Sequence, residues 1–331
     1  MTGLLAHPLR VTGRLLWLAA ELSLAGLSFL FGSLPGGPGH SRRERQAFWL
    51  QRGCRRVLRL LHVEVQVTGD VPAEGLLVSN HLSYLDILVL SSLTPALFVA
   101  KREVKTWPVF GWLAACGGTL FIDRERRHDV ARLNQEIKDV LGERVVLVIF
   151  PEGTSSDGQT VLPFKSSLLE PAAQANHTLT VSRLSYALSD GKVEDEVCYW
   201  RDMTMLPHML NLLSKRKIEA SVSFNRIHEG SNDRKELAKQ MHAAVLSLCT
   251  HLKSGCYTAV RIYNSRLSFL LASFICGRVL SCRREGEQQV SLRSGLRPSL
   301  GRMMNGFDCR LAALAEGWLR NRTCNTGPAL Y

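Results

Sequence analysis

The sequence lacks the signatures of several non-enzymatic protein classes. It has no paired Cys-x-x-Cys motif of the zinc-binding kind, no RNP-type motif and no lysine-rich tail, so a nucleic-acid-binding role is not favoured. It also has no internal repeat, which argues against solenoid and propeller architectures. Its nine cysteines are odd in number and irregularly spaced, which argues against a disulfide framework and favours reduced thiols in a cytosolic environment.

The N-terminal region lacks a long uninterrupted apolar run. The most apolar stretch, Leu15 to Phe31, is slightly short of the roughly 20 residues that a membrane-spanning helix needs, and Glu21 interrupts it. Arg14, Glu21 and Ser28 are seven residues apart and form one polar stripe along a helix. Such a helix either spans a membrane with its stripe against protein or lies partly in the interface; a buried soluble helix is a third alternative. No small-residue cleavage site follows, so a cleaved signal peptide is not expected.

The composition of the 331-residue chain favours anionic partners. Its formal net charge is +12 while 46% of its residues are hydrophobic, so the chain can both bury a large core and contact lipid. Residues 35–62 contain a basic amphipathic pattern that predicts a helix suited to an anionic membrane surface. The alternative is a helix docked on the domain with a solvated arginine face. If the preceding helix spans a membrane, the positive-inside rule places everything after residue 40 in the cytoplasm.

The remainder of the chain predicts an α/β domain. From Glu64 onward, short apolar runs alternate with helical patterns, which indicates a mostly parallel sheet covered by helices. We therefore divide the chain into a membrane helix and linker (1–34), the basic helix (35–62), an α/β domain (63–253) and an Arg/Cys-rich extension of unknown role (254–331). The expected strands are Val65–Thr68, Leu76–Ser79, Leu97–Ala100, Thr119–Ile122, Val145–Phe150, Leu179–Tyr186 and Ile218–Phe224, and the clearest helices are His128–Leu141 and Asp233–Leu252.

The run "LLVSNHLSYLDILVL" contains a histidine and an aspartate five residues apart. On one continuous helix His81 and Asp86 would point about 140° apart. However, Leu76–Ser79 reads as a strand and "SYLD" from Ser83 reads as a capping box, so His81 falls on the turn and can fold back towards Asp86. The carboxylate would then orient the imidazole as a base. Alternatively, Asp86 only caps the helix and His81 is an ordinary loop residue. A metal site is not expected, because no third ligand lies nearby.

Two further motifs follow predicted strands. "GGTLFIDR" ends in Asp123 and Arg124, and "VVLVIFPEGTSSDG" is a strand broken by Pro151 and followed by a carboxylate, a glycine and hydroxyls. The carboxyl ends of parallel strands are where α/β sheets bind ligands, so we expect these motifs and His81 to meet at one edge.

The three motifs resemble, in order and spacing, those of the glycerolipid and lysophospholipid acyltransferases. "NHLSYLD" is similar to that family's NH-x4-D signature, "GTLFIDR" to its second block and "FPEGT" to its third, and the resemblance covers about 63–249. It implies that His81 is the general base and Asp86 its partner, with acyl-CoA or acyl-carrier protein as donor, no cofactor and no catalytic metal. No Gly-x-Ser-x-Gly elbow is present, so a covalent acyl-serine is not expected. The same resemblance implies substrate-binding roles for Asn80, Lys101, Arg124, Glu152, Gly153, Thr154 and Lys165.

Two departures from the family pattern bear on the acceptor. Ser155 stands where many phosphate-accepting members carry arginine, which weakens the case for a phosphomonoester acceptor, although Lys165 or Lys101 can compensate. Val181 stands where the fourth block usually has proline. The first expectation is a membrane-bound enzyme, at the cytoplasmic face, that makes phosphatidic acid from 1-acyl-sn-glycerol 3-phosphate. The alternatives are the same chemistry on lyso-ornithine lipid and a catalytically silent membrane-surface binder.

Overall fold

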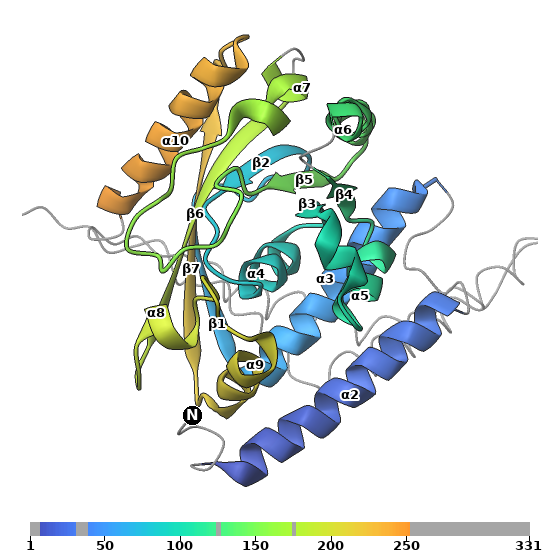
Figure 1. Cartoon of the computed structure of the whole chain (residues 1–331), viewed down its shortest axis with the longest axis vertical. Helices are drawn as coiled ribbons and strands as arrows, with labels where there is room; N and C mark the ends of the chain where they lie inside the picture. The colour runs from blue at the N-terminus through green and yellow to red at the C-terminus, as the bar shows by residue number, and fades with distance from the viewer. Residues whose placement is uncertain (1–6, 31–38, 124–126, 174–176, 252–331) are drawn as a thin grey trace, which may run out of the picture. The chain divides into compact units, whose positions relative to one another are not determined.

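The computed structural model describes residues 7–30, 39–123, 127–173 and 177–251, and its centre is one seven-stranded sheet (Figure 1). The strand order is β1-β7-β6-β2-β5-β3-β4, and every pairing is parallel except that of β6 with β7. The prediction of a mostly parallel sheet is therefore confirmed. The strands are β1 (Val63–Thr68), β2 (Gly75–Ser79), β3 (Ala96–Lys101), β4 (Leu120–Ile122), β5 (Val146–Ile149), β6 (Leu179–Leu188) and β7 (Ile218–Ile227), each overlapping a predicted strand.

Helices cover both faces of the sheet. The central strands are buried throughout, so Leu76 and Leu77 of β2 point into two different apolar clusters on opposite faces. One cluster includes Leu133 of α6 and Leu237 of α10, and the other includes Leu85 of α4. The helices are α2 (Pro8–Leu30), α3 (Arg42–Leu61), α4 (Leu85–Leu93), α5 (Phe110–Cys116), α6 (Arg127–Leu141), α7 (Glu170–Ala173), α8 (Val193–Glu196), α9 (Met205–Ser214) and α10 (Arg234–His251), with 3-10 turns at Arg102–Thr106 and Ser166–Leu168.

The polar stripe of α2 faces the protein. Arg14 donates to the carbonyl of Leu213 at 2.8 Å, Glu21 accepts from the Arg56 guanidinium at 2.6 Å, and Ser28 accepts from the Trp49 indole at 3.0 Å. The long diagonal helix in Figure 1 is therefore anchored at its beginning, middle and end. The helix also exposes large apolar side chains: Leu9, Leu16 and Leu27 on the side away from the stripe, and Trp17 and Leu24 along its flank.

No helix in the described part of the chain is both long enough and apolar enough to cross a membrane, so the spanning alternative for the N-terminal region is not confirmed.

The basic helix α3 is docked on the domain, as in the second alternative for this segment. Ser41 and Glu44 form a capping box that starts it, and Leu58 packs in the same cluster as α4. Three of its arginines contact other elements, because Arg43 pairs with Glu143, Arg55 donates to the carbonyl of Ser92 and Arg56 pairs with Glu21. Part of the positive charge of the helix is therefore used within the protein.

Everything described belongs to the first of two compact units, Met1–Asn264. The linker residues 31–38, Arg124 and the Arg/Cys-rich extension from 254 lie outside the described residues. The described cysteines Cys54, Cys116 and Cys198 are buried free thiols, and burial raises the pKa of the Cys54 thiol to about 12.

Candidate active site

Strand order brings the predicted motifs to one edge of the sheet. β5 lies between β2 and β3 and is parallel to both, so the carboxyl ends of the three strands lie side by side. His81 follows β2 by two residues, and Glu152 follows β5 by three. The amide of His81 donates to Glu152 Oε1 at 2.9 Å, so the turns after these strands touch directly. This agrees with the expectation drawn from the strand ends.

His81 and Asp86 form a hydrogen-bonded pair. His81 Nδ1 lies 2.8 Å from Asp86 Oδ2, and the Asp86 side chain is completely buried. A carboxylate only accepts hydrogen bonds, so Nδ1 carries the proton and Nε2 keeps its lone pair. The other carboxylate oxygen, Oδ1, accepts from the Tyr186 hydroxyl at 2.6 Å. The His81 side chain is 22% exposed, so the unprotonated edge of the ring belongs to a group that solvent can reach.

The predicted capping box is wrong in one respect. Helix α4 begins at Leu85, its N-cap position is Tyr84, and no side chain caps it. The Ser83 hydroxyl is buried without a hydrogen-bond partner among the described residues. Asp86 Oδ2 instead reaches back to the amides of Leu82 at 2.6 Å and Ser83 at 3.0 Å. This one carboxylate therefore accepts from the amides that precede the helix and also orients the His81 ring.

The backbone of His81 is held by the turn that follows β5. Besides accepting from the His81 amide, Glu152 accepts from the amide of Leu162 at 3.2 Å, and the Ser156 amide donates to the His81 carbonyl at 3.0 Å. The imidazole stacks on Phe150, with ring centroids 4.1 Å apart and planes 16° apart. Burial raises the pKa of the Glu152 carboxyl to about 7, against the opposing effect of its two N–H donors.

Two residues expected to bind substrate, Asn80 and Glu152, form hydrogen bonds with the protein backbone instead. The Asn80 amide pairs with both backbone groups of Leu184, at 3.0 and 2.7 Å, and so ties the end of β2 to β6. Glu152 is 3% exposed and both of its oxygens accept backbone hydrogen bonds. Their observed contacts therefore position the His81 turn. Gly153 has φ +77, the left-handed region that glycine adopts without strain, and lets the chain reverse after Pro151.

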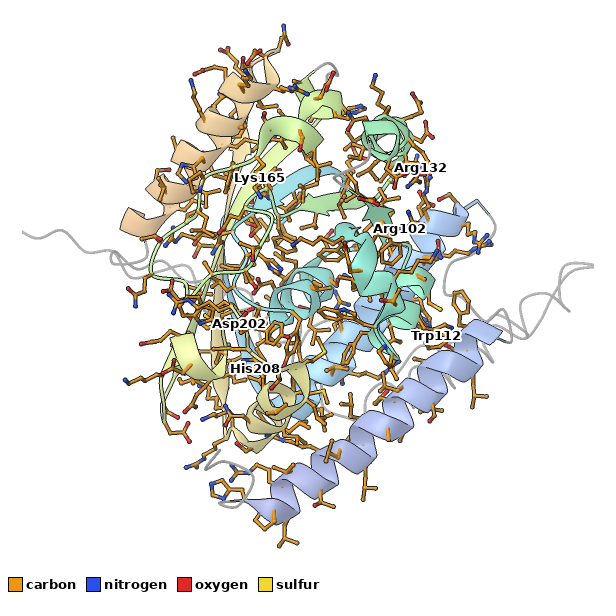
Figure 2. The ribbon with its side chains drawn as sticks, in the orientation of Figure 1. Arg102, Trp112, Arg132, Lys165, Asp202 and His208 are labelled. Carbon is orange, nitrogen blue, oxygen red and sulfur yellow. The ribbon has the colours of Figure 1, made fainter. Side chains whose placement is uncertain are left out.

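The remaining predicted residues are exposed around this edge. Thr154 is exposed on the same turn, and Lys165 is exposed while its amide donates to the carbonyl of Pro151 at 2.9 Å. Lys101 is exposed at the end of β3, next to the motif that ends in Asp123. Figure 2 labels Lys165 in the upper half of the domain, in front of β2 in this view, and Arg102, the residue after Lys101, beside β3 and β4. Arg124 lies outside the described residues.

Two residues of the site were not predicted. Tyr186 is the last residue of a predicted strand, and nothing in the strand pattern distinguishes it from its neighbours on the same face. Phe150 immediately precedes Pro151 and was counted only as a strand residue; its place next to the proline of "FPEGT" was the available signal. Both act on the pair from other strands, which explains why local sequence did not reveal them.

Comparison with known proteins identifies the class to which this fold and site belong. The Acyltransferase family model matches residues 62–187. The chain is 35% identical to a lyso-ornithine lipid O-acyltransferase of Pseudomonas aeruginosa, over 71% of this chain and 90% of that protein. It is 31% identical to a 1-acyl-sn-glycerol-3-phosphate acyltransferase of Neisseria meningitidis, over 64% of this chain and 83% of that protein. The chain therefore belongs to the acyltransferase family.

The fold agrees with a solved structure. The crystal structure of the 1-acyl-sn-glycerophosphate acyltransferase PlsC from Thermotoga maritima matches with a TM-score of 0.51 at 20% identity, covering 74% of this chain and 99% of that one. At this identity the match supports the fold alone.

Proposed function

We propose that this protein is a membrane-bound O-acyltransferase that moves a fatty acyl group from a thioester, acyl-CoA or acyl-carrier protein, to the hydroxyl of a lysolipid. The observation that carries the proposal is the pair formed by His81 and the buried Asp86, at the edge of the sheet where ligands bind. A base oriented in this way is what an alcohol needs to become a nucleophile at neutral pH.

The mechanism follows from the orientation of the ring. Nε2 of His81 takes the proton of the lysolipid hydroxyl while the hydroxyl oxygen attacks the thioester carbonyl. The tetrahedral intermediate collapses, the carbon–sulfur bond breaks, and the thiol leaves with a proton returned from the imidazolium. Asp86 stabilises the imidazolium between these two transfers, and its hydrogen bonds to Tyr186 and to two backbone amides keep it in place. The acyl group passes directly to the acceptor.

Lyso-ornithine lipid is the acceptor that we favour. The relatives named for that substrate, from Pseudomonas aeruginosa and Brucella abortus, are 35% and 34% identical and 90% of each is covered. Ser155 stands where many phosphate-accepting members have arginine. Its hydroxyl donates a hydrogen bond to the carbonyl of Tyr199, so the side chain is used in a contact within the protein. An ornithine headgroup carries no phosphate and requires no such arginine.

1-Acyl-sn-glycerol 3-phosphate, the acceptor expected first from the sequence, remains the second candidate. Lys101 and Lys165 are exposed at the edge that carries His81, and each supplies a cation for an acceptor phosphate. The identity of 31% to the Neisseria meningitidis relative also supports this candidate.

The outward side of α2 supports attachment to a membrane. Its exposed side chains Leu9, Leu16 and Leu27 lie on the side of the helix away from the polar stripe that anchors it. A helix held in this way presents one apolar face to an interface while its polar face remains on the protein. The cytoplasmic leaflet, where anionic lipids accumulate, suits a chain of net charge +12.

The decisive experiment measures thiol release from acyl-CoA and acyl-carrier protein with each of the two lysolipids. We expect release to require a lysolipid, to be faster with lyso-ornithine lipid, and to be abolished by His81→Ala. His208→Ala is the matched control, because His208 is also a largely buried histidine but pairs with Tyr84 and the Cys198 carbonyl. Retained turnover in His81→Ala would remove the base assignment, and no turnover with any lysolipid would favour a silent membrane binder.

A further inference from the structure

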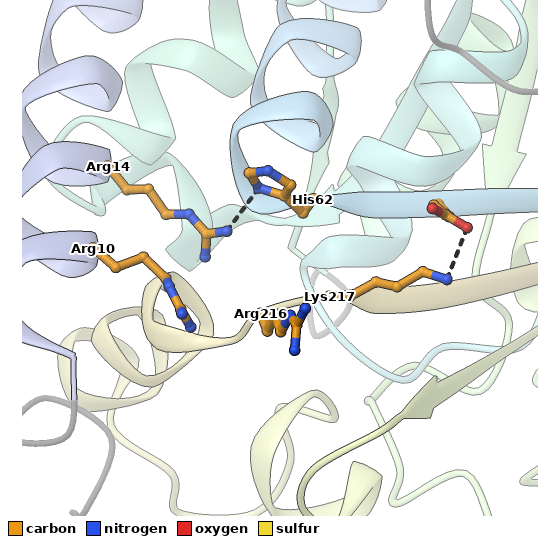
Figure 3. A pocket seen from close by; sticks show the side chains of 6 residues that line it. Arg10, Arg14, His62, Arg216 and Lys217 are labelled. Carbon is orange, nitrogen blue, oxygen red and sulfur yellow. Dashed lines mark hydrogen bonds and ion pairs between the residues drawn. The ribbon is translucent and has the colours of Figure 1, made fainter.

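A pocket of about 420 Å³ lies where the beginning of α2 meets the end of α3 and the turn before β7 (Figure 3). Its lining residues are Arg10, Arg14, His62, Glu64, Arg216 and Lys217. Four cations therefore face one carboxylate. That carboxylate is already engaged, because Lys217 Nζ lies 2.9 Å from Glu64 and 2.7 Å from Glu219.

The three arginines of the pocket have no acidic partner. In the part of the chain that the structure describes, no carboxylate oxygen lies within 4 Å of a guanidinium nitrogen of Arg10, Arg14 or Arg216. The nearby Glu196 is paired with Lys215. Burial and the charge of Arg10 lower the pKa of Arg14, as expected for two adjacent cations without a counter-ion.

Backbone contacts hold two of the three guanidinium groups, those of Arg10 and Arg14, in place. Arg14 is 6% exposed and donates to the carbonyls of Leu213 and Lys215 at 2.8 and 2.6 Å, and Arg10 donates to the carbonyl of Ser214 at 2.9 Å. These carbonyls order the arginines but carry no net charge. Arg14 also lies 2.7 Å from His62 Nδ1; since an arginine can only donate, the imidazole proton is on Nε2. The result is a fixed group of donors facing a cavity.

We propose that this pocket binds a phosphoryl group, supplied either by the headgroup of an anionic phospholipid or by a soluble phosphate. Guanidinium groups match the paired oxygens of a phosphate, and an anion would supply the charge that the pocket lacks. Its size exceeds what a single water molecule needs. Leu9, almost fully exposed beside Arg10, places apolar surface next to the cations, which suits a lipid headgroup.

The pocket is a second site, not part of the His81 site. Ser182 of β6 pairs with Ser79, next to the His81 turn, whereas Leu188 of β6 pairs with Ile218, next to Lys217. Six residues of strand separate the two positions, which is roughly 20 Å at the usual rise. The inference therefore goes beyond the proposed acyl transfer.

The test uses the full chain in an uncharged detergent and measures binding of inorganic phosphate by calorimetry against chloride of equal ionic strength. We expect Arg10→Gln and Arg216→Gln each to weaken phosphate binding about tenfold. Arg144→Gln is the charge-matched control, because Arg144 is an exposed arginine outside the pocket. Thermal unfolding without phosphate establishes that each variant is folded; Arg216 is exposed and has no hydrogen bond or ion pair among the described residues, so its loss leaves the fold unchanged.

A second arm measures flotation with phosphatidylcholine vesicles that contain or lack phosphatidylglycerol. If the two pocket variants weaken both phosphate binding and flotation with the anionic vesicles, the ligand is a lipid headgroup. If they weaken only phosphate binding, the ligand is soluble. Absence of phosphate binding in the unmodified protein, or an equal loss in Arg144→Gln, overturns the proposal. None of these measurements depends on acyl transfer.

Discussion

At the scale of single residues, Asp86 is a buried carboxylate whose capacity to accept hydrogen bonds is heavily used. Its two oxygens accept four hydrogen bonds, from His81, Leu82, Ser83 and Tyr186, in a fully buried setting. Such a carboxylate fixes the tautomer of the histidine and stabilises the charge that develops on it. The consequence is that its removal should affect the rate of the chemical step far more than substrate binding.

We therefore predict that Asp86→Asn lowers kcat by a factor on the order of 10³ to 10⁴ while KM changes little. Asparagine replaces an acceptor oxygen with an N–H group, so the histidine loses its orientation. Tyr186→Phe is the milder companion variant; it removes one donor without changing ring volume and should lower kcat about tenfold. Steady-state kinetics with circular dichroism as a folding check provide the measurement. Equal kcat in Asp86→Asn and the unmodified protein would contradict this role.

Glu152 is expected to make stability depend on pH. Burial raises the pKa of its carboxyl to about 7 in the folded protein, against 4.5 for the exposed group. Between these two values the folded state holds the proton that the unfolded state has lost, so this contribution is complete below pH 4.5 and is lost as pH rises through 7. The difference corresponds to about 3 kcal/mol of unfolding free energy.

This is tested by measuring the free energy of unfolding in urea for the unmodified protein and for Glu152→Gln. The measurements run from pH 5 to pH 8, a range of about three units that includes the folded-state pKa of Glu152. The glutamine variant should be less stable at pH 5, because its amide nitrogen faces a backbone N–H. Its stability should fall less with increasing pH than that of the unmodified protein. A constant difference between the two proteins across the range would show that Glu152 does not titrate there.

At the scale of secondary-structure elements, substitutions in α2 test whether its outward apolar face contacts the membrane. Leu16→Glu and Leu27→Glu place charges on its outward face without altering Arg14, Glu21 or Ser28. Loss of one buried leucine costs about 1.5–3 kcal/mol, so each variant should reduce partition into vesicles by at least about tenfold. The control is Leu246→Glu, at a leucine of α10 that is 42% exposed. Unchanged partition of the α2 variants would exclude this face as the membrane contact.

Elements were predictable where the pattern is periodic or continuous. The central strands β2 and β5 were placed because strands buried on both faces are continuous apolar runs, and the edge strand β1 because its valines alternate with polar residues. Helices α6 and α10 were placed because their apolar residues repeat at helical spacing. The start of α4 was misplaced, because a serine followed by an aspartate three residues later satisfies the capping pattern whichever side chain does the capping. Strand order, which brings Tyr186 to Asp86, depends on contacts between distant segments and leaves no local trace.

At the scale of the whole molecule, all described site residues belong to the unit Met1–Asn264. We predict that a protein ending at Asn264 retains thioester turnover with a lysolipid within about twofold of the full chain, because the sheet, His81, Asp86 and Glu152 are all kept. Thiol release and thermal unfolding of both proteins test this. Loss of turnover with an unchanged unfolding temperature would show that residues 265–331 contribute to catalysis.

The contacts of His81 with Asp86 and Phe150 also affect how the protein treats an acyl donor when no acceptor is bound. Contacts within the protein stack the imidazole on Phe150 and align it with Asp86, so the proposed base is preorganised. A preorganised base that solvent can reach will also activate water. Protection of the acyl donor against wasteful hydrolysis must then come from the bound acceptor, which displaces water from Nε2. With donor alone, the protein should hydrolyse the thioester slowly, and this background should disappear in His81→Ala.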